Sequence, residues 1–133
     1  MDKLTKQQRS FTMSKIHSKW TKPEIFVHSF LKGKKVKHKM HPNVAGKPDV
    51  LLIASNTVIF LHGCFWHKCP EDFKEPLTNK EYWIPKIEKN VYRDRINMET
   101  LRNQGYRVEV IWEHQIKRHP GEVKSLLLNL ASL

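Results

Sequence analysis

Residues 49–62 read DVLLIASNTVIFLH and give the clearest indication of the fold. They contain two apolar runs, 50–53 and 57–61, separated by a short polar turn. Unbroken apolar runs of this length are typical of strands that are buried on both faces. We therefore expect the two runs to form neighbouring strands at the centre of one sheet.

The sequence before this stretch predicts a helix and a further strand. Thr21 and Glu24 have the spacing of a capping box, in which each side chain satisfies a backbone donor of the first turn. The helix should end at Gly33 in a left-handed conformation. Apolar and basic residues alternate over 36–40, which indicates a strand with one solvated side.

The sequence after the central stretch predicts a long loop over 63–79 and then regular structure. Apolar spacings of three and four indicate a helix over 80–104, and Gly105 should end it. A third buried strand over 106–112 and an amphipathic helix over 115–131 complete the chain. The expected order of elements is α, β, β, β, α, β, α, which is an α/β fold with helices flanking a central sheet.

Length and charge limit the possible functions. A chain of 133 residues suffices for one domain, and its apolar runs are shorter than the roughly 20 residues that a membrane helix needs. Twelve Lys and Arg against three acids give the first fifty residues a charge of +9, out of +11 overall. We expect a basic arm over 1–19 that binds nucleic acid, although a basic surface that only serves solubility stays open.

The segment that follows the second central run combines unusual residue types. His62, Cys64, Phe65, Trp66, His67 and Cys69 place two imidazoles, two thiols and two large aromatic rings within eight residues. No packing rule requires this mixture, and two cysteines so close together are better explained by reduced thiols or metal ligands than by a secreted disulfide scaffold. We expect a soluble cytoplasmic protein whose function lies in this segment.

Two acidic residues add to the candidate site. Asp49 begins a central strand and offers a hard oxygen for Mg²⁺, although an aspartate after proline also occurs in ordinary turns. Many metal-dependent nucleases place a first metal ligand at such a position and carry an acid-x-Lys triplet on the next strand. That triplet is absent here, since residues 61–63 are Leu, His and Gly. Asp94 falls on the apolar stripe of the long helix, where a buried charge needs a partner.

These motifs together resemble one family. They are Gly46-Lys47-Pro48-Asp49, the run from Val58 to His67 with its His-Gly-Cys-Phe-Trp-His string, Lys89-Asn90 with Arg93-Asp94-Arg95, and Trp112-Glu113. They resemble the very-short-patch-repair DNA mismatch endonucleases. The resemblance implies a restriction-endonuclease-like fold of the PD-(D/E)XK type, with an endonuclease domain over 20–133. It also implies nicking 5′ to the thymine of T:G mismatches that arise from deamination of 5-methylcytosine.

The same resemblance implies roles for catalytic residues. Asp49 would bind Mg²⁺ together with the backbone carbonyl of Leu61. His67 would activate water, and His62 would be a second active-site histidine oriented by Asp94. Glu24 would lie near the histidines, although the capping box already gives its carboxylate a local role.

DNA contacts and a structural Zn²⁺ are also implied. Phe65, Trp66 and Trp83 would wedge into the base stack, and Asn90 would contact DNA, although Asn90 is nearly as well explained as a solvated helix residue. The zinc ligands would be Cys64, Cys69, Asp72 and His114, although metal-free reduced thiols stay open. We expect a monomer acting on double-stranded DNA in the bacterial nucleoid, functionally associated with a cytosine-5 DNA methyltransferase.

Some alternatives remain open from the sequence alone. The chain could be a nuclease of different specificity on the same core, or a zinc-stapled DNA-binding protein without catalysis. The other histidines carry no motif and are expected at the surface without a role; they are His17, His28, His38, His41 and His119.

Overall fold

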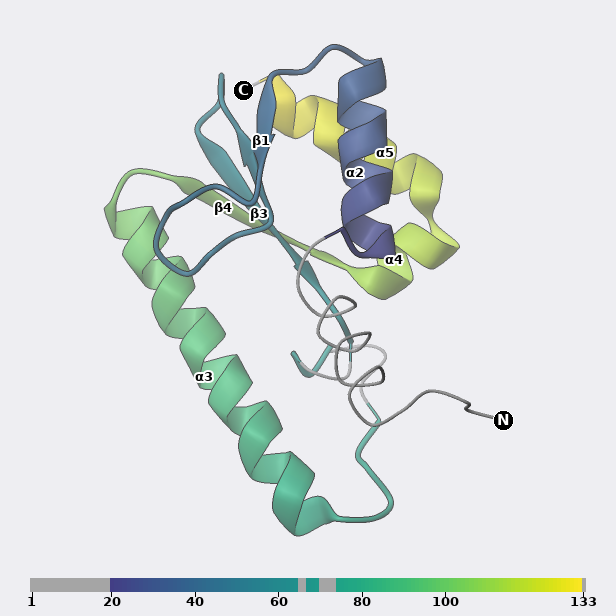
Figure 1. Cartoon of the computed structure of the whole chain (residues 1–133), viewed down its shortest axis with the longest axis vertical. Helices are drawn as coiled ribbons and strands as arrows, with labels where there is room; N and C mark the ends of the chain where they lie inside the picture. Colours follow the sequence, from purple (N-terminus) through teal and green to yellow (C-terminus); the bar gives the residue numbers. More distant parts are fainter. Residues whose placement is uncertain (1–19, 65–66, 70–73, 133) are drawn as a thin grey trace, which may run out of the picture.

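Four strands form one sheet in the computed structural model, which describes residues 20–64, 67–69 and 74–132 (Figure 1). They are β1 (His38–Met40), β2 (Val50–Leu52), β3 (Thr57–His62) and β4 (Arg107–Trp112), and they lie in that order across the sheet. The first two pairings are antiparallel, whereas β3 and β4 are parallel. The expected mixed sheet is therefore confirmed.

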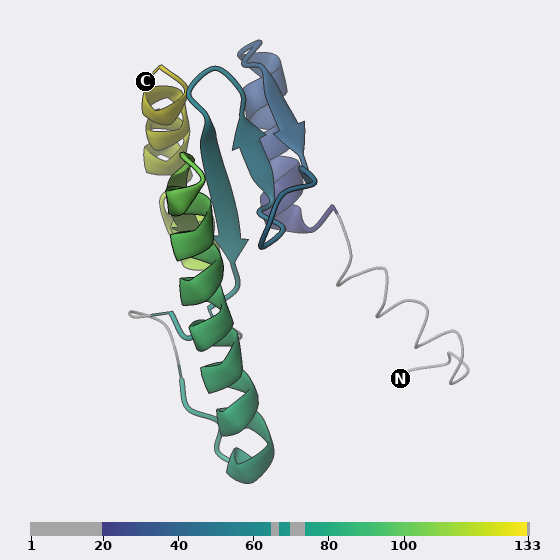
Figure 2. The ribbon, with the colours of Figure 1, turned by 90° about the vertical axis from the view of Figure 1, so that its left-hand side faces the viewer.

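Four helices cover the sheet within the described residues. They are α2 (Lys22–Gly33), α3 (Lys80–Asn103), α4 (Glu113–Arg118) and α5 (Pro120–Ala131). Figures 1 and 2 show α3 on one face and α2 with α5 on the other. The helix α3 is the crossover that joins the parallel strands β3 and β4, since a parallel connection must return the chain to the same end of the sheet.

The strand β3 is the most buried element, as its apolar run predicts. Val58 and Phe60 pack with Leu101 of α3, while Ile59 points to the opposite face. The larger core lies on that opposite face and is built from α2, the strands and α5; its buried members are Val27, Leu31, Val50, Leu52, Ile59, Ile111, Val123, Leu127 and Leu130. The carboxyl end of β3, where His62 lies, is thus fixed by packing on both faces.

Only part of α3 packs against the sheet. Its C-terminal half contributes Leu101 and Met98 to the core, whereas its N-terminal half continues past the ends of the strands (Figures 1 and 2). Pro85 lies inside this helix without interrupting it. The helix ends as expected before Gly105, which has a φ of +96°.

Three details of the expected elements are wrong. The left-handed residue after α2 is Lys35, with a φ of +58°, rather than Gly33. The expected helix over 115–131 is two helices, because Pro120 cannot donate to a preceding turn and instead begins α5. In β4 only Ile111 is fully buried, so this edge strand is not the buried strand that its apolar content predicts.

None of the described helices is long and apolar enough to cross a membrane. The expected arm over 1–19 lies outside the described residues, so the expected division into arm and domain stays a prediction.

Candidate active site

Asp49 immediately precedes β2 and reaches across to β3. Its Oδ2 atom accepts a hydrogen bond of 2.7 Å from the backbone N–H of Leu61. Its own backbone N–H donates to the Ile59 carbonyl at 3.0 Å. In a strand, the N–H and C=O groups of one residue point to the same side. Because the Leu61 N–H points to Asp49, the Leu61 carbonyl faces the same side. A carboxylate and a carbonyl therefore meet at the end of the sheet.

The two histidines of the motif form a parallel stack. Residues after β3 turn back, with Cys69 N–H donating to the Cys64 carbonyl at 2.9 Å. This turn brings the His67 ring onto His62, with ring centroids 3.9 Å apart and an interplanar angle of 5°. The Nε2 atom of His62 is buried and makes no hydrogen bond within the described residues.

Asp94 pairs with His67 rather than with His62. The Nδ1–H of His67 donates to Asp94 Oδ2 at 2.5 Å, with Asp94 projecting from the middle of α3. We expected this carboxylate to orient His62, and that expectation is wrong. The reason is the backward turn of the loop, which gives His67 the position from which a ring nitrogen reaches α3.

One cavity of about 510 Å³ brings these residues together. Its lining includes Asp49, Leu61, His62, His67, Arg93 and Asp94. An acid, a backbone carbonyl, two imidazoles and a guanidinium thus surround one space at the carboxyl end of β3. This set can bind a divalent cation, hold a water molecule and offset negative charge on a phosphate.

Burial shifts the pKa values of two members in opposite directions. Burial raises the pKa of Asp49 to about 6, even though the hydrogen bond from Leu61 favours the ionised form. Burial also lowers the pKa of His62 to about 4, and the nearby His67 adds to this effect. His62 is therefore a neutral imidazole at pH 7.

The low pKa of His62 predicts a loss of stability in mild acid. Below its ordinary pKa of 6.5 the unfolded chain takes up a proton at His62 that the folded chain refuses until about pH 4. The free energy of unfolding should therefore fall by about 2 kcal/mol between pH 7.5 and 5 from this residue alone. Chemical denaturation of the wild type and a His62→Gln variant checks it, because the opposing contribution of Asp49 is common to both. Parallel pH curves would contradict the assignment.

A third histidine, His41, was expected at the surface without a role but lies beside this site. Glu24 is 5 % exposed, and its Oε2 atom accepts hydrogen bonds from the Trp20 backbone N–H at 2.5 Å and from His41 Nε2–H at 2.8 Å. One half of the expected capping box is present, because the Thr21 hydroxyl accepts a hydrogen bond from the Glu24 N–H at 3.5 Å. In the other half, the backbone N–H that donates to the Glu24 carboxylate belongs to Trp20 instead of Thr21. No sequence motif surrounds His41, so only its place after β1 could have marked it.

Two further histidines were also wrongly expected to be free surface residues. His28 and His38 are partly buried, and their ring nitrogens Nδ1 and Nε2 are 2.9 Å apart. His38 bonds the Val36 carbonyl through its other nitrogen. The pair lies next to Trp20, whose ring meets His28 edge-on.

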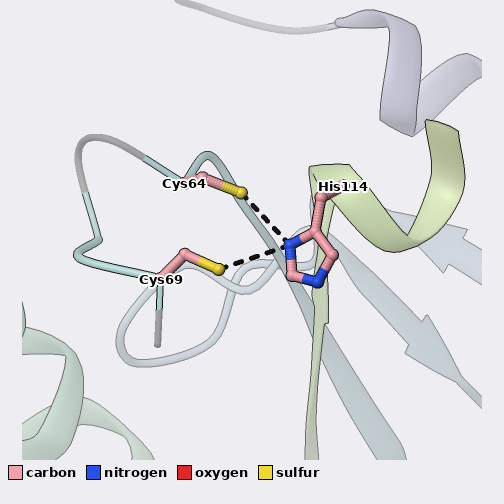
Figure 3. A group of neighbouring side chains, drawn as sticks. All are labelled: Cys64, Cys69 and His114. Atoms are coloured by element: carbon pink, nitrogen blue, oxygen red, sulfur yellow. Dashed lines mark hydrogen bonds between the residues drawn. The ribbon is translucent and has the colours of Figure 1, made fainter. Parts of the chain in front are cut away.

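A second cluster consists of two cysteines and a histidine (Figure 3). Cys64 and Cys69 come from the loop after β3, and His114 comes from the first turn of α4. Both sulfur atoms face His114 Nδ1, at 3.4 and 3.3 Å, and all three side chains are buried. For tetrahedral Zn²⁺ the expected separation of sulfur and nitrogen ligands is about 3.6 Å, so these donors fit a metal ion with little movement.

Comparison with known proteins identifies the family. The family model for DNA mismatch endonuclease Vsr matches residues 1–71. The type II nicking enzyme V.NmeAIP of Neisseria meningitidis is 42% identical over 119 residues, which are 87% of this chain and 84% of that protein. The chain belongs to the Vsr family. The expected family and enzyme class, an endodeoxyribonuclease, are thereby confirmed.

Other Vsr relatives match comparable lengths. DNA mismatch endonuclease Vsr of Escherichia coli K12 is 39% identical over 111 residues, covering 81% of this chain and 70% of that protein. The type II nicking enzyme V.XorIIP of Xanthomonas oryzae is 34% identical over 131 residues, covering 97% and 96%. The similarity therefore extends beyond the catalytic motif.

Three of the positions expected to act in this Vsr chain, Phe65, Trp66 and Asp72, lie outside the described residues. Two others, Trp83 and Asn90, do not line the cavity. Trp83 and Asn90 lie on the half of α3 that continues past the sheet, where Trp83 meets Tyr82 edge-on and Asn90 Oδ1 accepts a hydrogen bond of 2.8 Å from Arg93. Arg93, which bonds Asn90, also lines the cavity that contains Asp49.

Proposed function

We propose that this protein nicks DNA 5′ to the thymine of T:G mismatches that arise from deamination of 5-methylcytosine, in a reaction that requires Mg²⁺. The fold would then be a restriction-endonuclease-like fold of the PD-(D/E)XK type. The observation that carries the proposal is the single cavity in which Asp49, Leu61, His62, His67 and Asp94 meet. A protein that only binds DNA has no need of a half-buried carboxylate beside a stacked pair of imidazoles.

Asp49 and the carbonyl of Leu61 would hold the Mg²⁺ ion. Hard oxygen ligands suit this ion, and a carbonyl ligand explains why the chain carries no acid at position 61. When bound, the ion supplies positive charge that offsets the developing charge on the phosphate. The raised pKa of Asp49 reflects burial without a cation, and a cation beside it would favour the ionised form.

His67 and Asp94 would prepare the attacking water. Asp94 accepts the Nδ1–H of His67, which leaves Nε2 of that ring as the proton acceptor. His67 would take the proton of a water molecule held in the cavity. His62, neutral and stacked on His67, would keep that ring in place.

Cys64, Cys69 and His114 would bind a structural Zn²⁺ ion, with Asp72 as the fourth ligand. The ion would hold the loop that contains His67 at two points, Cys64 and Cys69. Glu113 supports the same loop, since its carboxylate accepts the Cys64 N–H at 3.1 Å. The zinc ligands would thereby position the catalytic histidine without taking part in the reaction.

The zinc site predicts a defined loss in cysteine variants. Cys69→Ser should remove bound zinc, lower the melting temperature and reduce cleavage, because the loop then loses an anchor. Zinc per protein molecule, measured by atomic emission, should fall from about one to near zero. Asp72→Asn should weaken zinc binding less than the cysteine change. Full zinc content in both variants would rule out these ligands.

The DNA contacts complete the proposal. The basic arm over 1–19 would bind phosphates, and Phe65, Trp66 and Trp83 would wedge beside the mismatch, with Asn90 as a further contact. Opening a wobble-paired mismatch costs less than opening a matched pair, which would favour T:G sites. The protein would act as a monomer in the bacterial cytoplasm, on sites made by a cytosine-5 methyltransferase.

A cleavage assay tests this proposal. The wild type and Asp49→Ala are incubated with otherwise identical T:G and matched duplexes, with and without Mg²⁺. Only the wild type with Mg²⁺ should cleave, and only the T:G duplex. Equal cleavage of both duplexes would instead indicate a nuclease of different specificity, and no cleavage would indicate a DNA-binding protein.

A further inference from the structure

Glu24 is a buried carboxylate whose two donors come from different parts of the chain. Trp20 lies just before α2, whereas His41 lies directly after β1. Both donate to the same oxygen, Oε2, at 2.5 and 2.8 Å. Burying a carboxylate is costly unless it is hydrogen-bonded, so these two donors make the buried position of Glu24 possible.

His41 is also bonded to the residue that begins β2. Its backbone N–H donates to the Asp49 carbonyl at 2.9 Å, while its ring bonds Glu24. The negative charge of Glu24 reaches Asp49 and contributes to the raised pKa of that carboxyl group. His41 thus connects two residues that carry carboxyl groups: its main chain bonds the backbone carbonyl of Asp49, and its ring bonds the carboxylate of Glu24.

Helix capping does not account for this arrangement. A capping carboxylate needs a backbone donor beside its own helix, and Trp20 supplies one. His41 belongs to another element and adopts a left-handed backbone with a φ of +53°, and Trp20 also has a positive φ, +64°. Such a conformation costs about 1 kcal/mol or more for a residue with a side chain, and costs of this kind gather at functional sites.

We propose that His41 is a positioning residue of the catalytic centre, whose ring holds the Glu24 carboxylate in a fixed place beside Asp49. This inference rests on the proposed function. His41 acts through Glu24 and touches neither DNA nor the metal. Within the described residues the other oxygen of Glu24 makes no hydrogen bond, so the position of the carboxylate depends on the two bonds to Oε2.

Two substitutions at position 41 separate positioning from packing. His41→Asn suits the left-handed backbone but is too short to reach Glu24, whereas His41→Gln extends an amide donor toward it. His41→Asn should lower the single-turnover cleavage rate at saturating DNA by about 10- to 100-fold while leaving DNA affinity unchanged. His41→Gln should recover most of that rate. His28→Phe is the matched control, because His28 also contacts Trp20 but does not bond Glu24, and it should keep the wild-type rate.

A double-variant cycle with Glu24→Gln decides the mechanism. If His41 acts through Glu24, His41→Asn should change the rate little once Glu24 is already replaced. Wild-type rate in the folded His41→Asn protein, or an equal further loss in the Glu24→Gln background, would overturn the proposal.

The same link has a readout that does not depend on activity. In nuclear magnetic resonance spectra of the metal-free protein, the Nε2–H signal of His41 should be protected from exchange and should lose that protection in Glu24→Gln. Absence of the protected signal from the wild type overturns the positioning proposal. Absence of wild-type cleavage, with the signal present, overturns only the proposed function.

Discussion

Asp49→Asn is expected to abolish Mg²⁺-dependent cleavage and yet to stabilise the metal-free protein. Burial raises the pKa of Asp49 to about 6. Above that pH the carboxyl group is ionised in the folded chain, where burial disfavours the charged form, and this lowers the free energy of unfolding. The neutral amide removes this cost, and the free energy of unfolding at pH 8 should rise by about 1–3 kcal/mol. Cleavage should fall by at least about 1,000-fold, because the proposed metal ligand is lost.

The stability that Asp49→Asn gains should depend on pH. The stabilising contribution of the protonated Asp49 is fully present below its unfolded pKa of 3.8 and is lost as the pH rises through about 6. The advantage of Asp49→Asn should therefore be largest at pH 8 and shrink toward pH 5. Urea denaturation at both pH values, without added metal, measures it. The exposed Glu99→Gln serves as the control and should change neither stability nor cleavage. An Asp49→Asn protein that is less stable at pH 8 would contradict the described burial.

His67→Ala is expected to reduce the single-turnover cleavage rate by about 100- to 10,000-fold with little effect on DNA affinity. The reason is that a positioned general base contributes a factor of this size. Asp94→Ala should cause a loss of similar kind, because without the carboxylate the His67 ring loses the partner that fixes its tautomer. Quenched-flow cleavage of a T:G duplex with excess enzyme provides the rates.

The double variant distinguishes a pair that works together from two independent residues. If Asp94 acts through His67, His67→Ala with Asp94→Ala should be about as slow as His67→Ala alone. His119→Ala removes an exposed imidazole outside the cavity and should keep the wild-type rate. Losses that multiply in the double variant would mean that Asp94 has a separate role.

The sequence predicted the elements that depend on local patterns. Continuous apolar runs located β2 and β3, and apolar spacing located α3 with its end before Gly105. These features follow from rules that act over a few residues. The division of the last helix was missed, although Pro120 was the signal for it, because the apolar spacing continues across the break.

The candidate site was predicted less completely, because its pairings join distant parts of the chain. The motif string placed His62 and His67 together, but it could not tell which of them Asp94 would reach from α3. His41 escaped notice for the same reason, since its partner lies 17 residues away in α2 and no local pattern marks a side chain that crosses between elements. The three metal donors were expected from the family resemblance, and their convergence depends on α4 meeting the loop after β3.

Mapping the cleavage position on a strand-labelled T:G duplex is the strictest test of the proposed function. With the wild type and Mg²⁺, we predict one nick in the thymine strand, immediately 5′ to the mismatched thymine, and an intact guanine strand. The matched duplex should stay intact under the same conditions. Breaks in both strands, breaks away from the thymine, or the same nick in the matched duplex would contradict the account.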